Sequence, residues 1–138
     1  MAVPRPGVQE RILLHLRDYI DHADKVEVPF ALSQMGIANA VAIARSNVPR
    51  AIAGMREQGH LIERQAHVTG VSRKRKAYFL TEDGANIAND IWSKVSAQSV
   101  RLVHPDGRSE TLELAQALEA TELPLRHVDF LRYIDDTG

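Results

Sequence analysis

The fold is decided by residues 33–58, SQMGIANAVAIARSNVPRAIAGMREQ. The serine at position 33 offers an N-cap oxygen, which predicts a short helix through Val41. A tight connection over residues 42–45 leads to a second helix, predicted over residues 46–58. This helix carries apolar side chains at the spacing of a buried stripe, namely Val48, Ile52 and Met55. Two short helices joined so closely predict a helix-turn-helix.

The flanking sequence predicts the other elements of a winged helix. In chain order they are an amphipathic helix over residues 8–21, a short edge strand over 25–30, a hairpin with strands over 61–68 and 73–80, and a helix that begins after Thr81. Gly59 follows the second helix where a C-terminal glycine is expected. The order helix, strand, helix, helix, hairpin, helix is that of a winged helix-turn-helix, so we expect a mostly helical α+β fold.

The rest of the chain predicts a short C-terminal α/β appendage. We expect a winged helix-turn-helix domain over residues 8–96 and an acidic appendage over residues 97–138. The elements expected in the appendage are a strand over 99–103, a turn over 104–107, a second strand or helix start over 111–114, and helical segments around 114–120 and 125–134. Two interpretations of the appendage stay open, a truncated second domain and a dimerisation segment.

Charge is distributed unevenly along the chain, although its net value is only −1. Residues 45–76 carry eight basic and two acidic side chains, a net of +6, whereas residues 77–138 carry five basic and eleven acidic side chains, a net of −6. A nearly neutral protein with one concentrated basic stretch is typical of a localised anion-binding face. Four cations are consecutive at residues 73–76, on a hairpin tip for which we expect no anionic neighbour. Phosphate binding explains them, because each contact releases counterions.

The exposed side of the second helix supplies further candidate residues. A helix of this kind enters the major groove, where Arg50 can bind guanine bidentately or contact a phosphate. Ser46 and Asn47 lie at the predicted helix N-terminus, which favours phosphates, and Gln34 could contact one from the preceding helix. The candidate DNA-binding residues are Gln34, Arg45, Ser46, Asn47, Arg50, Arg73, Lys74, Arg75 and Lys76.

Several other function classes find no support in the sequence. It contains no cysteine, and its six histidines are scattered without a metal-ligand spacing. No nucleophile–base arrangement or phosphate-binding glycine loop is apparent. No apolar run approaches the roughly 18 residues of a membrane span, and the first residues lack the apolar core of a signal peptide. We therefore expect a cytoplasmic protein that is not an enzyme, has no cofactor or metal and does not associate with a membrane.

Three segments resemble a known family. Residues 33–38 (SQMGIA) with 43–52 (IARSNVPRAI), and residues 61–64 (LIER) through 73–84 (RKRKAYFLTEDG), are similar to the helix-turn-helix and the wing of MarR-like winged-helix regulators. The resemblance covers about residues 8–95. More narrowly, the sequence resembles an archaeal group in which this domain lies at the N-terminus of a larger protein. By this resemblance Asn47 and Arg50 are groove-reading residues and residues 73–76 belong to the wing.

The sequence departs from the family pattern at three positions. The family usually has glycine where Ala42 stands, a serine N-cap where Ala44 stands, and serine or a similar residue where Pro49 stands. Proline is tolerated only in the first turn of a helix. We therefore expect Ser46 to be the N-cap and Pro49 to lie in the first turn, which delays the recognition helix by about half a turn.

These observations lead to one function and one alternative. We expect sequence-specific or semi-specific binding of double-stranded DNA by a transcription regulator, with helix 46–58 in the major groove and the wing, residues 69–76, on the phosphate backbone. We expect a homodimer, because one helix reads few bases and two half-sites raise affinity. The alternative is a protein-interaction winged helix that acts as an adaptor or assembly module without base readout, with a protein partner docked on the acidic C-terminal segment.

Overall fold

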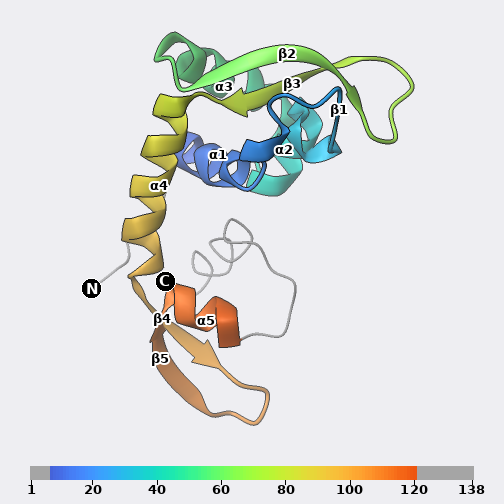
Figure 1. The fold of residues 1–138 in the computed structure, drawn as a ribbon. Helices are drawn as coiled ribbons and strands as arrows, with labels where there is room; N and C mark the ends of the chain where they lie inside the picture. The colour runs from blue at the N-terminus through green and yellow to red at the C-terminus, as the bar shows by residue number, and fades with distance from the viewer. Residues whose placement is uncertain (1–6, 121–138) are drawn as a thin grey trace.

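The computed structural model describes residues 7–120. Its elements are α1 (Val8–Arg17), β1 (Glu27–Val28), α2 (Gln34–Val41), α3 (Val48–Glu57), β2 (Leu61–Val68), β3 (Arg75–Leu80), α4 (Glu82–Ser96), β4 (Ser99–Val103), β5 (Ser109–Glu113) and α5 (Leu114–Ala120) (Figure 1). Short 3₁₀ turns occupy Ile20–His22, Phe30–Leu32 and Arg45–Asn47. The order through α4 is the predicted helix, strand, helix, helix, hairpin, helix, and the fold is the expected α+β winged helix-turn-helix.

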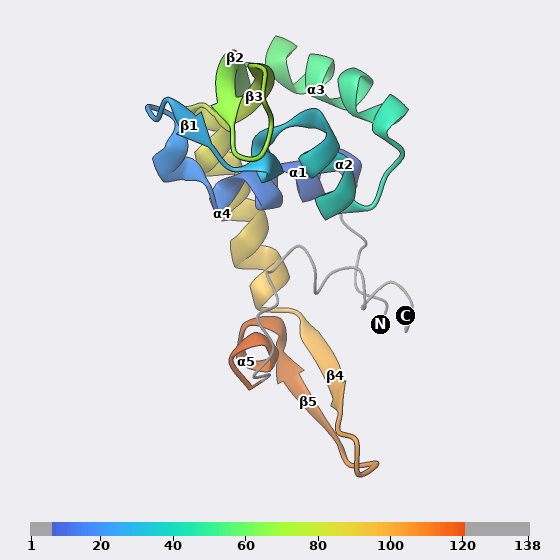
Figure 2. The ribbon, with the colours of Figure 1, turned by 90° about the vertical axis from the view of Figure 1, so that its right-hand side faces the viewer.

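The winged helix contains a small sheet with the strand order β1-β2-β3. Strand β1 runs parallel to β2, with Val28 opposite Val68, and it is the predicted edge strand of the sheet. Strands β2 and β3 are antiparallel from the pair Leu61–Leu80 to the pair Ala66–Arg75. Figure 2 shows β1 on one side of the β2–β3 hairpin and α3 on the other.

The core forms where the apolar faces of the helices meet this sheet. The predicted stripe of α3 is buried, since Val48 and Met55 are fully inaccessible and Ile52 is 3% exposed. The side chains that it joins, all less than 2% exposed, include Ile12 and Leu16 of α1, Ile37 and Val41 of α2, and Tyr78 of β3. Burial of this apolar stripe fixes which side of α3 remains in contact with solvent.

Two predicted helix caps are present. The Ser33 hydroxyl accepts a hydrogen bond from the backbone amide of Gly36 at 3.1 Å. The Thr81 hydroxyl accepts one from Gly84 at 3.0 Å and donates one to the carbonyl of Gly59. Helix α3 ends as expected, because Gly59 has a φ of +77°. The residues after α3 and before α4 are therefore hydrogen-bonded to each other.

Helices also approach other backbone segments very closely at two glycines. A Cβ atom at Gly36 would overlap the carbonyl oxygen of Phe30, and one at Gly84 would overlap the carbonyl oxygen of His60. Neither glycine has a positive φ, so the requirement here is space and not backbone conformation.

The start of α3 differs from the prediction. Ser46 is not an N-cap, because it lies inside a 3₁₀ turn in which the amide of Asn47 donates to the carbonyl of Ala44 at 2.9 Å. Asn47 precedes the α-helix with helical φ and ψ of −88° and −15°, and its side chain makes no cap hydrogen bond. An N-cap side chain needs an extended backbone to reach back to the helix amides, which neither residue has. Pro49 does lie in the first turn, as predicted.

Ala42 adopts a left-handed conformation at the end of α2, with a φ of 58° and a ψ of 50°. Its amide donates to the carbonyl of Ala38, and the amide of Ile43 donates to the same oxygen at 3.1 Å. This is the position at which the resembling family usually has glycine. Within residues 7–120, Ala42 is the sole residue other than glycine with a positive φ.

Three other elements are shorter than predicted. Helix α1 ends at Arg17, four residues before the expected end at residue 21, and the 3₁₀ turn Ile20–His22 follows it. Strand β1 has two residues, since the rest of the expected 25–30 segment does not pair with the sheet. Strand β3 begins at Arg75, so the wing tip is the loop of residues 69–74.

The described part of the appendage is a hairpin followed by a helix. Strands β4 and β5 pair from Ser99–Glu113 to Val103–Ser109, so the second strand begins two residues before the expected 111–114 segment. A second, smaller core joins the appendage to the end of α4 and to α1 through Leu14, Val95, Val100, Leu114 and Ala117. In Figure 1 this unit lies at the end of α4 that is far from the wing. The helical segment expected around 125–134 lies outside the described residues.

Candidate nucleic-acid interface

A groove of about 470 Å³ lies between the wing, the start of α2 and the turn before α3. It brings together five of the nine predicted DNA-binding residues, which are Gln34, Arg45, Lys74, Arg75 and Lys76. Four of these are cations, and the groove has no carboxylate in its lining. Apolar side chains from Phe30 and Met35 also line it and are 39% and 41% exposed. The groove can therefore contact both an anion and an apolar group beside it.

The other predicted residues lie on the surface outside the groove lining. Ser46 and Asn47 belong to the 3₁₀ turn, and Arg50 lies in the first turn of α3, all three exposed to solvent. Arg73 is exposed in the wing loop. Ser46 and Asn47 follow Arg45 directly in the chain, and Arg73 directly precedes Lys74, so both exposed segments continue from residues of the groove lining.

Most cations of this surface have no anionic partner. Within residues 7–120, no carboxylate pairs with Arg45, Arg50, Arg73, Lys74 or Arg75. Unpaired cations close together repel one another, and they raise the local positive potential. Such a surface attracts an anion with several charges.

Lys76 corrects the expectation that the basic run has no anionic neighbour. Its Nζ lies 3.9 Å from Oε1 of Glu63, because the hairpin register places these residues near each other on paired strands. The Glu63 carboxylate also forms an ion pair with Arg56 of α3, whose Nη1 lies 3.4 Å from Oε2. Glu63 thus lies between one cation of α3 and one cation of β3.

Tyr78 links Glu63 to the start of α2. The phenol donates to Oε1 of Glu63 at 2.9 Å and accepts from Nε2 of Gln34 at 2.9 Å. Burial raises the pKa of Tyr78 above its ordinary value of 10.0, and the carboxylate of Glu63 acts in the same direction. The phenol therefore keeps its proton at neutral pH.

Sequence reasoning missed Glu63, Tyr78 and Arg56, which are connected to Gln34 and Lys76 of the groove. Glu63 is one of only two acidic residues among residues 45–76, which is the one signal that sets it apart in the sequence. Its partners are set by the pairing of Glu63 with Tyr78 across the hairpin. That register follows from the loop length, which the sequence leaves open.

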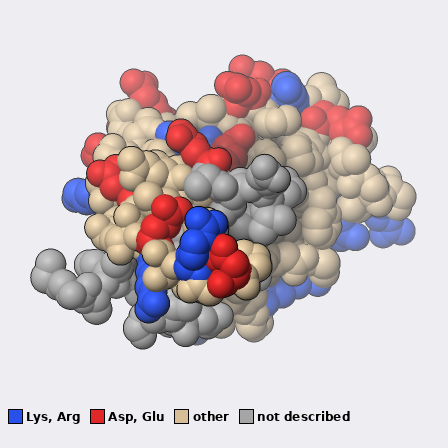
Figure 3. All heavy atoms as spheres, turned by 90° about the horizontal axis from the view of Figure 1, so that it is seen from below, with Lys and Arg blue, Asp and Glu red and all other residues tan. Residues whose placement is uncertain are grey.

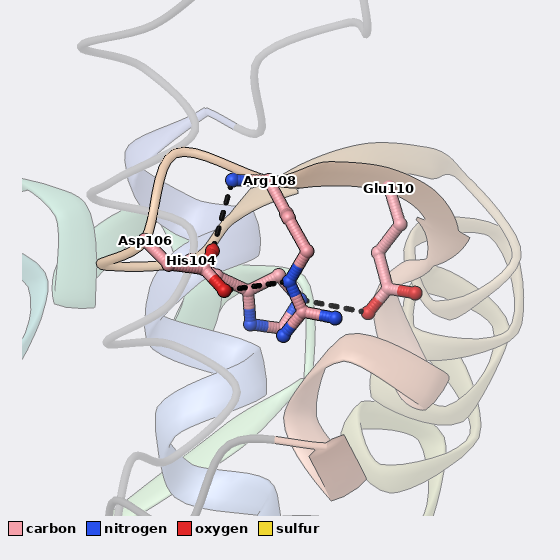
Figure 4. Close-up of polar contacts among 4 residues, drawn as sticks. All are labelled: His104, Asp106, Arg108 and Glu110. Atoms are coloured by element: carbon pink, nitrogen blue, oxygen red, sulfur yellow. Dashed lines mark hydrogen bonds and ion pairs between the residues drawn. The ribbon is translucent and has the colours of Figure 1, made fainter.

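The charges of the C-terminal hairpin are arranged differently. Nε of Arg108 lies 2.7 Å from Oδ2 of Asp106, and Nε2 of His104 lies 3.1 Å from Oε1 of Glu110 (Figure 4). Two hydrogen bonds from Arg108, one from its backbone amide and one from its side chain, lower the pKa of Asp106. Seen from below, Lys and Arg lie directly beside Asp and Glu in the part nearest the viewer, and further Lys and Arg lie along the lower and right-hand edges (Figure 3).

Among residues 7–120, no group of three or more His, Asp or Glu side chains is placed to hold a metal ion. No helix in the same residues is both long enough and apolar enough to cross a membrane.

No family model matches the sequence, and no curated protein does. Among solved structures, the chain is similar to Lactococcus lactis ZitR, described as a zinc-responsive MarR family member, with 21% identity over 68% of this chain and a TM-score of 0.49. It is also similar to a mutant of S. aureus MepR, with 17% identity over 64% of this chain and a TM-score of 0.49. The matches cover 56% of each of those chains, so this chain spans little more than half of their length.

Proposed function

We propose that this winged helix is the double-stranded DNA-binding domain of a transcription regulator. The observation that carries the proposal is the groove lined by four cations and no carboxylate, between the wing and the helix-turn-helix. Three of these four cations have no carboxylate partner within residues 7–120. Holding them close together contributes nothing to folding, whereas a DNA backbone neutralises them and releases counterions.

The groove suits one strand of a DNA backbone. Phosphates are spaced along a strand with sugars between them, so a strand offers anions and apolar surface in alternation. Lys74 and Arg75 supply cations on the wing side, and Arg45 supplies one on the helix-turn-helix side. Phe30 and Met35 supply exposed apolar surface for the sugars.

Helix α3 is suited to the major groove, which is about 12 Å wide and admits one helix. Its buried stripe leaves Arg50 and Ala53 exposed on the other side. The small side chain of Ala53 lets the helix approach the groove closely, and Arg50 is long enough to reach guanine or a phosphate. One long side chain gives limited base readout, so we expect semi-specific binding that a homodimer sharpens by using two half-sites.

A salt titration of duplex affinity tests the proposal. Replacement of Arg73, Lys74, Arg75 and Lys76 by alanine should reduce the slope of log affinity against log salt by about 3, because each lost phosphate contact removes roughly 0.9 and Lys76 is shared with Glu63. The matched control replaces four cations elsewhere by alanine, namely Lys25, Lys94, Arg101 and Arg108. Equal slopes for the two variants would contradict the wing assignment.

Selection of binding sites from random duplexes tests specificity. Enriched palindromes are expected if the protein reads DNA as a symmetric dimer.

The alternative function is that of a protein-interaction winged helix. Two features favour it: the 3₁₀ turn that delays the start of α3, and Pro49 in the first turn of α3. Complete absence of duplex binding at low salt would favour that alternative.

A further inference from the structure

We propose that Glu63, held by Tyr78, is a positioning residue that lowers the affinity of this surface for any DNA backbone and raises its discrimination between sequences. This inference rests on the proposed function, because it concerns how the same surface distinguishes one duplex from another. It concerns residues outside the predicted DNA-binding set except for Gln34 and Lys76.

The first step is the position of Glu63, which lines a separate hollow with Arg56 and Glu57 and reaches Lys76 of the basic groove. Its side chain is 21% exposed, and its carboxylate lies within 4 Å of one cation on α3 and one on β3, Arg56 and Lys76. These cations are 49% and 56% exposed. A carboxylate at this place neutralises charge that a phosphate would otherwise use, so it weakens backbone binding.

The second step is the direction of the hydrogen bonds. A carboxylate only accepts, so the single phenol proton of Tyr78 goes to Glu63. The phenol oxygen must then accept from Gln34, which turns the amide nitrogen of Gln34 toward Tyr78 at 2.9 Å. Tyr78 is 1% exposed, so the central residue of this hydrogen-bond chain is held in place by the packing around it. It ties together α2, β2, β3 and, through Arg56, α3.

The third step is what this arrangement does for recognition. Backbone binding alone is insensitive to sequence, and free cations on flexible side chains adapt to many duplex shapes. Cations held by one carboxylate bind well only to a duplex that presents its phosphates at matching positions. A feature that penalises mismatched partners increases specificity even though it lowers overall affinity.

Two substitutions separate the charge of Glu63 from its hydrogen bonding. Glu63→Gln removes the charge and keeps the shape, while Tyr78→Phe removes the hydroxyl and keeps every charge. Glu57→Gln is the matched control, because Glu57 is the other acidic residue among residues 45–76 and lines the same hollow as Glu63, but pairs with no cation within residues 7–120. Affinities for a generic duplex and for the selected site are measured across a salt series for each variant.

The expected results differ among the three variants. Glu63→Gln should steepen the salt slope for the generic duplex by about 1 to 2, as one or two cations are freed, and should reduce discrimination about tenfold. Tyr78→Phe should leave the slope unchanged and reduce discrimination by a similar factor. Glu57→Gln should leave discrimination unchanged.

Two outcomes would overturn the inference in distinguishable ways. If Glu63→Gln and Glu57→Gln behave alike while the wild type binds duplex, Glu63 contributes only net charge and this inference alone fails. If the wild type binds no duplex at any salt concentration, the proposed function fails together with it. Unchanged discrimination in Tyr78→Phe, measured on folded protein, would show that the hydrogen-bond chain does not position the cations.

Discussion

The two β-hairpins of this protein handle charge in opposite ways. In the β4–β5 hairpin, Asp106 and Arg108 pair across the turn and His104 pairs with Glu110 (Figure 4). In the β2–β3 hairpin, the wing, Arg73, Lys74 and Arg75 have no carboxylate partner within residues 7–120. Four ionisable groups of the β4–β5 hairpin are thus paired within it, whereas three cations of the wing have no carboxylate partner among residues 7–120.

The two hairpins also differ in what supports them. The wing belongs to a three-stranded sheet whose β3 side chains from Ala77 to Leu80 are buried in the main core. The β4–β5 hairpin is a two-stranded sheet joined to the rest by the small cluster around Leu114 and Val100. The β2–β3 hairpin, which is packed against the larger core, therefore carries the unpaired cations that repel one another.

Among substitutions that test the difference in support between the two hairpins, Leu114→Ala should have the largest effect on stability. Leu114 is fully inaccessible in the small core, so the substitution should lower the free energy of unfolding of that core by about 2–4 kcal/mol through lost burial and a cavity. Urea unfolding followed by fluorescence of Trp92, which packs against this cluster and is the only tryptophan, measures it.

Val103→Ala is the control for this experiment, because Val103 is 62% exposed on the same hairpin and should change stability by less than about 0.5 kcal/mol. Affinity for duplex should be unaffected by Leu114→Ala. A parallel loss of duplex affinity would mean that the two units are not separable in function.

A smaller effect, of opposite sign, is expected at Ala42 in the helix-turn-helix. The left-handed conformation costs an L-residue about 1–2 kcal/mol, and glycine relieves this at an entropic cost of about 0.5–1 kcal/mol. Ala42→Gly should therefore raise the free energy of unfolding by roughly 0.5–1 kcal/mol. Chemical denaturation measures the change, and Ala40→Gly, inside α2, should destabilise by about 1 kcal/mol. Destabilisation by Ala42→Gly would contradict the assigned backbone conformation.

The smallest effect concerns the pKa of Asp106 in the β4–β5 turn. Hydrogen bonds from the backbone and the side chain of Arg108 lower this pKa below 3.8. The resulting stabilisation is present above pH 3.8 and is lost as the pH falls through the lowered pKa. Arg108→Ala removes the side-chain contribution and keeps the amide, so the pKa should rise part of the way toward 3.8. NMR titration of the carboxyl carbon measures it, with Arg101→Ala as a control that should leave the pKa in place.

Sequence reasoning identified the winged helix because its signals are local. The caps at Ser33 and Thr81 and the stripe of Val48, Ile52 and Met55 each depend on residues within two turns of one another. The start of α3 was harder to predict, because a 3₁₀ turn and an α-helix place their first hydrogen bonds only one residue apart. A serine at position 46 fits an N-cap by its chemistry, but its backbone is already inside the turn.

The polar chain through Glu63 and Tyr78 is different, because its contacts cross elements far apart in sequence. Gln34 and Tyr78 are 44 positions apart, and their hydrogen bond exists only after α2 packs beside β3. The positive groove could be anticipated from the run at residues 73–76. The pairing of Glu63 with Lys76 of this groove could not be anticipated, because it depends on the register of the β2–β3 hairpin.

Gly36 and Gly84 impose a restriction on how this chain can vary. At each of them a single methyl group would overlap a carbonyl oxygen of another segment, that of Phe30 or that of His60. Even the smallest side-chain replacement should fail there, whereas exposed positions such as Ala53 should accept many. In a saturation library selected for folded protein, glycine should be almost the only residue found at positions 36 and 84. In proteins that evolve from this sequence, these two glycines should be retained more often than the cations of the wing.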